Sequence, residues 1–347
     1  MQPTFNHHFL NGKLQDNWLQ LVIDIYLTSL IYNLSNFNME YATWYLLYHQ
    51  IWCSQVILSS RYALNPVLES LIQLLQLILI GIVGKYTREK ENQLLVTLVF
   101  IAYKLALFIP YTYVISYYPS KNIKSILPLL TALVLEIGLW IAALYTDYYI
   151  LLWLIGISIE KLGTIYAICL DIPTYIAYFN DRFCVFTITL LGMALFNQIT
   201  GYPSDSSFTL VKLAHTLLYT ILTFSFWHNY FYCTKFEEVE HKFIWRAVWI
   251  ITQLLLHFFI SLLGNDPLLT VASIGGILVF TSILNSLDRV TEKRFLLVAR
   301  LVAAIITITL GITIQEELYK LLSITVVFVV LMIIEHLLFT QKLAYTR

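Results

Sequence analysis

Long apolar runs, separated by short polar or proline- and glycine-containing stretches, recur along the whole chain. A run of about 20 apolar residues is the length that an α-helix needs to cross the hydrocarbon core of a bilayer. Only Asp147 separates two of the runs, and the first run contains Asp24, so a count of ten or eleven helices is the alternative to twelve. The twelve expected helices lie at about residues 18–35, 41–60, 66–84, 94–116, 126–145, 148–170, 184–200, 207–232, 243–263, 268–287, 295–314 and 318–339.

This pattern predicts an all-α fold, a polytopic bundle of transmembrane helices, and the composition agrees with it. Of the 347 residues, 59% are apolar and only 12% are charged, whereas about a quarter of the residues of a soluble domain are charged. The expected environment is therefore a lipid bilayer. Lys and Arg number 21, as do Asp and Glu, so the chain has no excess of basic residues with which to bind nucleic acid.

Four cysteines occur, and none of them forms a CxxC pair. The sequence therefore predicts neither a zinc site nor a disulfide framework, and no cofactor is expected. The first 17 residues are polar and lack a cationic start followed by an apolar core, so no cleaved signal peptide is predicted and the first helix would direct insertion. The cysteines are Cys53, Cys169, Cys184 and Cys233.

The basic residues between the expected helices predict the orientation of the chain. Placing both termini and every second loop on one side collects most of the loop lysines and arginines there, and basic loops face the cytoplasm. Both termini are thus expected in the cytoplasm. The pattern does not distinguish the plasma membrane from an internal membrane.

Two stretches resemble each other and suggest a parallel duplication of six helices, as in some transporters. LIQLLQLILIGIVG at 71–84 follows Arg61, and WIITQLLLHFFISLLG at 249–264 follows Arg246. Glu160 and Glu335 also lie late in each half. The alternative is that any two helices rich in Leu and Ile look alike. The expected organisation is a cytoplasmic segment at 1–17, a first transmembrane half at 18–170, a cytoplasmic linker at 171–183 and a second half at 184–347.

Ionisable residues inside a membrane span are costly and therefore indicate function by default. Lys104 lies too deep in its helix to reach the interface easily, so a buried acidic partner is expected, with Glu136 and Asp24 as candidates. His257 is equally consistent with a simple hydrogen bond to a neighbouring helix. Glu69, Asp147 and Lys161 are expected near the interfaces. The candidates for a polar pathway are Asp24, Lys104, Glu136, Glu160, His257 and Glu335.

One stretch, YIAYFNDRFCVFTITLLGMALFNQITG at 175–201, combines an Asp-Arg pair with a helix that carries polar residues on one face. Asn180 and Asp181 suit the start of a helix, but this does not explain Arg182. Within the stretch, YFNDRFCVFT and the following LGM resemble the characteristic tract of the low temperature requirement A family of bacteria and fungi. That tract has an aromatic or His residue, Phe, Glu-Arg-aromatic-Gly-Leu, Thr and a closing Leu-Gly-Glu.

Other segments are similar to the same family. QLVIDI at 20–25 resembles its Glu-Leu-Phe-Phe-Asp-Leu pattern, and the aromatic helix at 44–52, followed by Arg61-Tyr62 and Glu69, resembles its second helix. The resemblance covers about 18–263 and is closer to the fungal branch. Gln20 and Met193 stand where the family tends to have glutamate, and Asp181 replaces a third. The family-motif residues carried over to this chain are Asp181, Arg182, Thr187 and Gly192.

The resemblance implies a polytopic membrane protein linked to growth at low temperature, a family whose molecular activity is not established. From the buried charges we expect a transporter or channel for an ion, a proton or a small solute. The alternative is a structural or stress-adaptation protein that acts through lipids or partner proteins. An intramembrane lipid-modifying enzyme has the least support, because HExxH, GxSxG and DxxD motifs are absent, and no catalytic residue is assigned.

Overall fold

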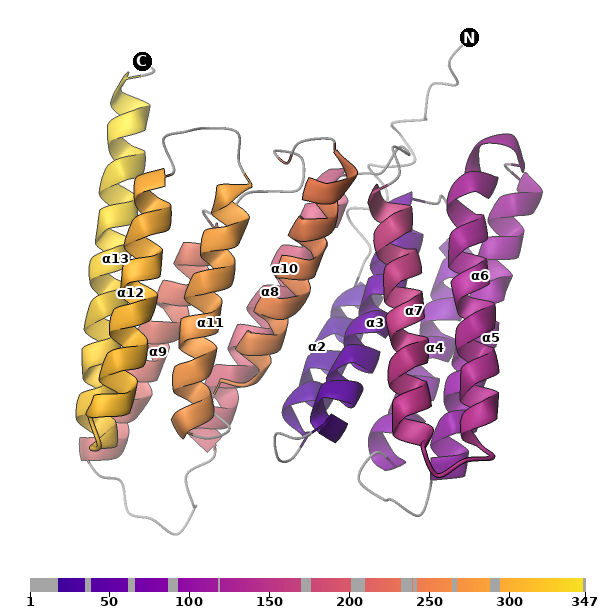
Figure 1. The fold of residues 1–347 in the computed structure, drawn as a ribbon, viewed down its shortest axis with the longest axis horizontal. Helices are drawn as coiled ribbons and strands as arrows, with labels where there is room; N and C mark the ends of the chain where they lie inside the picture. The colour runs from indigo at the N-terminus through magenta and orange to yellow at the C-terminus, as the bar shows by residue number, and fades with distance from the viewer. Residues whose placement is uncertain are drawn as a thin grey trace. The chain divides into compact units, whose positions relative to one another are not determined.

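In the computed structural model, the described residues form twelve α-helices (Figure 1). The structure describes residues 18–34, 39–61, 66–86, 93–117, 119–169, 176–200, 210–231, 239, 242–263, 267–287 and 294–345. The expected all-α fold is thereby confirmed, whereas the N-terminal segment 1–17 lies outside these ranges.

Most helix boundaries lie within a few residues of the apolar runs, but the helices expected at 126–145 and 184–200 begin earlier, at 119 and 176. Helical structure satisfies the backbone groups at membrane depth within each segment. The helices are α2 (Trp18–Tyr32), α3 (Met39–Arg61), α4 (Pro66–Tyr86), α5 (Gln93–Tyr117), α6 (Pro119–Ala143), α7 (Tyr149–Cys169), α8 (Ile176–Thr200), α9 (Leu210–Phe231), α10 (Phe243–Ser261), α11 (Pro267–Ser286), α12 (Arg294–Thr313) and α13 (Glu317–Tyr345).

Ten of these helices, α4 to α13, are long and apolar enough to cross a membrane by length and composition. The exceptions are α2, whose apolar part is shorter, and α3, which is long but rich in polar side chains. Large apolar side chains such as Leu71 and Ile78 on α4 and Ile305 and Ile312 on α12 are exposed. An apolar exterior around a partly polar interior is the arrangement expected for a protein in contact with lipid.

The chain forms two compact units, Met1–Arg182 and Phe183–Arg347. In the first unit, α5 packs on α4 and α6, α7 packs on α6 and α3, and α2 packs on α3 and α4. In the second unit, α11 packs on α10, α12 and α9, and α13 packs on α12 and α9. The expected linker 171–183 overlaps α8, which begins at Ile176 in the first unit and continues into the second.

Glycines on α7 allow a close approach to α6 in the first unit. A Cβ atom added to Gly163 would lie 2.7 Å from Cβ of Ala132, and one added to Gly156 would lie 3.1 Å from Cγ of Glu136. Small residues at such positions let transmembrane helices approach closely. This packing brings Glu136 on α6 next to the polar face of α7.

Candidate functional site

The polar core of the first unit is organised by α3, which packs on both α2 and α7. Its buried polar residues, all less than a tenth exposed, are Thr43, His49, Gln50, Ser54, Gln55, Ser59 and Ser60. Side chains separated by four residues lie on the same face of a helix, so His49 and Cys53 form one pair and Gln50 and Ser54 another. Because buried polar groups need partners, the contacts of α3 define the site.

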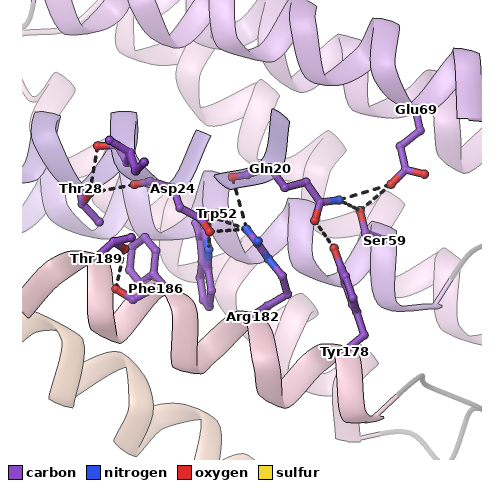
Figure 2. Close-up of polar contacts among 11 residues, drawn as sticks. Gln20, Asp24, Thr28, Trp52, Ser59, Glu69, Tyr178, Arg182, Phe186 and Thr189 are labelled. Atoms are coloured by element: carbon purple, nitrogen blue, oxygen red, sulfur yellow. Dashed lines mark hydrogen bonds and ion pairs between the residues drawn. The ribbon is translucent and has the colours of Figure 1, made fainter. Parts of the chain in front are cut away.

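The first cluster of this core is an ion pair between α2 and the start of α8 (Figure 2). One terminal nitrogen of Arg182 lies 2.5 Å from both carboxylate oxygens of Asp24. The indole N–H of Trp52 on α3 donates to Asp24 Oδ1 at 3.0 Å. Asp24 is fully buried and Arg182 nearly so. Asp24 is therefore the partner of Arg182, and not of Lys104 as one of the two expectations had it.

A network of hydrogen bonds continues from this cluster toward Ser59 on α3 and Glu69 on α4 (Figure 2). The Gln20 amide donates to the Ser59 hydroxyl at 2.9 Å and to Glu69 Oε1 at 3.4 Å, and Ser59 donates to the same oxygen of Glu69 at 3.0 Å. The Tyr178 hydroxyl donates to the side-chain oxygen of Gln20. Gln20 thus joins Ser59, Glu69 and Tyr178 through an uncharged amide.

The second cluster contains two carboxylates and one ammonium group from three consecutive helices. Lys104 Nζ on α5 lies 3.1 Å from Glu136 Oε2 on α6 and forms a second ion pair with Glu160 on α7. The Ser54 hydroxyl on α3 donates to Glu160 Oε1 at 3.2 Å. All three charged side chains are buried. Of the two acids expected as partners of Lys104, Glu136 is the one within reach, and Glu160 joins it.

Lys161 was expected to extend toward an interface, and that expectation was wrong. The side chain is buried, and its ammonium group lies 2.8 Å from His49 Nδ1 and 3.3 Å from Cys53 Sγ on α3. Since an ammonium group can only donate, Nδ1 of His49 accepts, and the imidazole is neutral in this arrangement. Lys161 is therefore buried against neutral partners.

The faces of α3 and α7 match in register. Gln50 donates to Thr164 at 3.1 Å, and Ser54 donates to Glu160. Moving four residues toward the C-terminus of α3 therefore corresponds to moving four residues toward the N-terminus of α7, as in an antiparallel pair of helices. The same helix α3 contacts Asp24 through Trp52 and Lys161 through His49. The polar helix α3 therefore forms hydrogen bonds with all three groups of buried charges described above, through Asp24, Glu160 and Lys161.

An aromatic cluster borders the second group of charges. The rings of Trp140 on α6 and Trp153 on α7 stack with centroids 4.9 Å apart, and Phe100 and Trp44 pack on them. Among the described residues, neither indole N–H has a hydrogen-bond partner. A Cβ atom at Gly156 would lie 3.0 Å from Trp140 Nε1, so this indole nitrogen and Glu136 approach the same point on α7.

The second unit contains a different pair, between α12 and α13. Arg300 Nε donates to Glu335 Oε1 at 2.7 Å, while its two terminal nitrogens donate to the backbone oxygens of Thr281 and Asn229 at 3.1 and 3.0 Å. His228 Nδ1 lies 3.9 Å from Glu335 Oε2. Arg300 and Glu335 are fully buried. The sequence analysis did not assign Arg300 to Glu335, although a basic residue inside an apolar run was a usable signal.

The remaining candidates belong to the second half of the family-like tract and to α10. Thr187 Oγ1 lies 2.9 Å from His257 Nε2, and the ring of Phe186 packs edge-on against the imidazole. This contact matches the simpler interpretation of His257, a hydrogen bond between helices. Asp181 is exposed, and nothing lies within 4 Å of a Cβ atom built on Gly192.

The structure therefore brings Lys104, Glu136 and Glu160 together and places Asp24 with Arg182, all in the first unit. His257 and Glu335 have separate partners in the second unit. Within the described residues, no group of three His, Cys, Asp or Glu side chains could hold a metal ion. Sequence reasoning missed four contributors, namely His49, Cys53, Ser54 and Arg300.

These observations define an integral, multi-pass membrane protein with buried charged residues. Comparisons of the chain with models of known protein families, with curated proteins and with solved structures found no match.

Proposed function

We propose that this protein is a transporter or channel whose pathway for a proton, an ion or a small solute runs through the polar core of the first unit. The observation that supports the proposal most strongly is that α3 forms hydrogen bonds with two separate clusters of buried charges. Trp52 contacts the Asp24–Arg182 pair, and Ser54 contacts the Lys104–Glu136–Glu160 cluster. Intramembrane charges in contact with polar groups are typical of substrate and ion pathways.

The energetics favour a working site over simple helix pairing. A buried ion pair is at best weakly stabilising compared with apolar residues of the same volume, so the six buried charged side chains among the described residues of the first unit are an expensive way to hold helices together. They are Asp24, Lys104, Glu136, Glu160, Lys161 and Arg182. Neutral donors and acceptors on α3 offer alternative partners, which lets charges exchange partners without being left unsatisfied.

Transport is tested by reconstituting the purified full chain into liposomes and measuring flux under an imposed pH gradient and with a broad panel of ions and solutes. We expect flux above that of empty vesicles, lost in Asp24→Asn and retained in Asp147→Asn, whose carboxylate is exposed between α6 and α7. Flux equal to that of empty vesicles across the whole panel would contradict the proposal.

A structural or stress-adaptation role, through lipids or partner proteins, is the second candidate. The Arg300–Glu335 pair supports it, because one carboxylate is matched by one guanidinium group, whose nitrogens donate to Glu335 and to two backbone oxygens. If this role were the main one, neutralising Glu136 would lower the thermal stability of the purified protein and leave liposome permeability unchanged.

The resemblance to the low temperature requirement A family leads to a proposal of distant membership. Its two matched segments supply Asp24 and Arg182, and these residues contact each other. A contact between two separately matched positions is expected if both are retained from a common architecture. A solved structure of a bacterial member in which the first-helix acid lies away from the motif arginine would contradict this proposal.

We also propose a parallel duplication, with α2–α7 equivalent to α8–α13. In each set, the second helix packs on the sixth, the third on the fourth, the fourth on the fifth and the fifth on the sixth. Both sets place a glutamate on the sixth helix. An experimental structure in which the two sets do not superpose by rotation about the membrane normal would refute the duplication.

The orientation remains a proposal as well, with both termini in the cytoplasm because of the basic loops. Reporter tags at residues 1 and 347 test it. In intact cells both tags should be inaccessible to an added antibody and become accessible on permeabilisation.

A further inference from the structure

We infer that the Lys104–Glu136–Glu160 cluster is a proton-binding site in which Glu136 takes up and releases the proton. The inference names the ligand of the proposed pathway and so rests on the proposed transport function. Three observations support it: the ratio of charges in the cluster, the contacts of each carboxylate, and the contact of the cluster with α3 through Ser54.

The cluster has one more carboxylate than it has ammonium groups, so one bound proton is needed to make it neutral. Two carboxylates meet one ammonium group, and all three side chains are less than a tenth exposed. With every group ionised, the cluster carries one net negative charge in a medium of low dielectric constant, which is strongly unfavourable. One bound proton makes it neutral. Lys161 does not supply the missing positive charge within ion-pair distance, because its contacts are His49 and Cys53.

The two carboxylates differ in their partners. Glu160 accepts hydrogen bonds from both Lys104 and Ser54, and such bonds stabilise the ionised form. Glu136 Oε2 lies 3.1 Å from Lys104 Nζ, and among the described residues neither oxygen of Glu136 has a hydrogen-bond partner of good geometry. Glu136 is therefore the group that holds the proton, while Glu160 remains ionised against Lys104.

Release of the proton can be compensated within the cluster. The Glu136 carboxyl group transfers its proton to a water molecule, which becomes hydronium, and is left as a carboxylate. The flexible stem of Lys104 then allows the ammonium group to be shared between Glu136 and Glu160, and Ser54 continues to donate to Glu160. Lysine suits this role because its charge is a point on a mobile side chain and not a fixed planar fork.

Other titratable groups face the cluster from the helices packed around it, and each could in principle hold the proton instead. They are Tyr103 beside Lys104 on α5, Lys161 on α7, and His49 and Cys53 on α3. Infrared difference spectroscopy separates them, because only a carboxyl group shows a carbonyl stretching band when protonated.

The first experiment uses the detergent-purified full chain and needs no transport. The spectra are recorded across a pH titration for the native protein, Glu136→Gln, Glu160→Gln and the control Glu317→Gln, whose carboxylate is exposed at the start of α13. We expect one band of a buried carboxyl group that is retained in the control. Loss of this band in Glu136→Gln supports the inference. The band should also be lost in Glu160→Gln, because the Glu136 carboxylate and the Lys104 ammonium group then form a neutral pair without a bound proton. A band that persists in Glu136→Gln overturns it, whatever the result in Glu160→Gln.

The second experiment separates this inference from the proposed function. Reconstituted protein is given a proton gradient without Na⁺ or K⁺, and then a Na⁺ or K⁺ gradient at constant pH. Proton flux that is lost in Glu136→Gln and retained in Glu317→Gln supports both proposals. A carboxyl band without flux of any solute overturns transport and leaves the proton site standing, whereas native-level flux in Glu136→Gln, or flux of Na⁺ or K⁺ alone, overturns the proton site.

Discussion

Each of the two units buries a glutamate inside a helix, and the two glutamates have different partners. In the first unit, Glu160 on α7 shares Lys104 with a second acid, Glu136. In the second unit, Glu335 on α13 pairs with one arginine, Arg300, and His228 Nδ1 lies 3.9 Å from its other carboxylate oxygen. In both units a buried carboxylate has a basic partner. In the first unit two carboxylates share one lysine, whereas in the second unit one carboxylate has one arginine.

The choice of base accounts for the difference in behaviour. Arg300 presents a planar set of donors, and its three nitrogens reach Glu335 and the backbone oxygens of Thr281 and Asn229. Such an arrangement ties together α9, α11, α12 and α13 and leaves little freedom. Lys104 has a compact charge on a flexible stem, between two carboxylates. The comparison suggests a rigid second unit and a titratable first unit.

The largest expected effect is on the rigid pair. Arg300→Met leaves Glu335 as an uncompensated buried carboxylate and removes donors from two backbone oxygens, so we expect a loss of about 3–5 kcal/mol in the free energy of unfolding. Thermal unfolding of the detergent-purified protein measures it. The double variant Arg300→Met with Glu335→Gln should recover part of the loss, and no recovery would argue against a direct pair.

A smaller effect is expected from the corresponding change in the first unit. Lys104→Met leaves Glu136 and Glu160 together, but both can take up protons, so we expect a loss of about 1–3 kcal/mol. Adding Glu136→Gln should partly restore stability, because a single carboxyl group remains with the Ser54 hydroxyl. Equal damage from the single and double variants would contradict the assigned pairing.

The close approach of α6 and α7 is the next test. Gly163→Ala places a methyl group 2.7 Å from Cβ of Ala132, so the helices must separate slightly, at a cost of about 1–2 kcal/mol. The carboxyl band of the Glu136 cluster should shift as well. Gly192→Ala is the matched control, since nothing lies within 4 Å of its added methyl group; equal effects of the two changes would refute the packing argument.

The smallest effect concerns the hydrogen bond between α8 and α10 in the second unit. Thr187→Val removes the partner of His257 Nε2, and we expect a loss of about 1 kcal/mol in unfolding free energy with no change in flux. Thr189→Val is the control, because that hydroxyl donates only within its own helix, to Phe186. A loss of flux in Thr187→Val would move His257 into the pathway.

Much of the fold could be predicted because its signal is local. An apolar run of about 20 residues carries its own evidence for a membrane helix, and a charge such as Lys104 inside it is visible without a structure. The exception is α3, which was expected as an ordinary span. The sequence shows its polar residues, but only the packing on α2 and α7 reveals that they serve as shared partners for charges on other helices.

The candidate site was less predictable because pairing is not local. Arg182 meets Asp24 across 158 positions and Lys104 meets Glu160 across 56, and no pattern in a short window selects one acid over another. Lys161 shows the same limit: the side chain was expected near an interface, whereas the register of α7 on α3 directs it to His49 and Cys53.

The sequence by itself determined that this chain is a multi-pass membrane protein and placed most of its buried charges within helices, because hydropathy and length are properties of each single helix. Arg182, which was expected in a linker, lies within α8. Only the tertiary structure decided which charges meet. The close packing of α6 on α7 leaves two acids with one lysine, and the packing of α12 on α13 leaves one acid with one arginine. Helix packing brings together side chains that are distant in the sequence, and the electrostatic balance of a buried cluster depends on that packing alone.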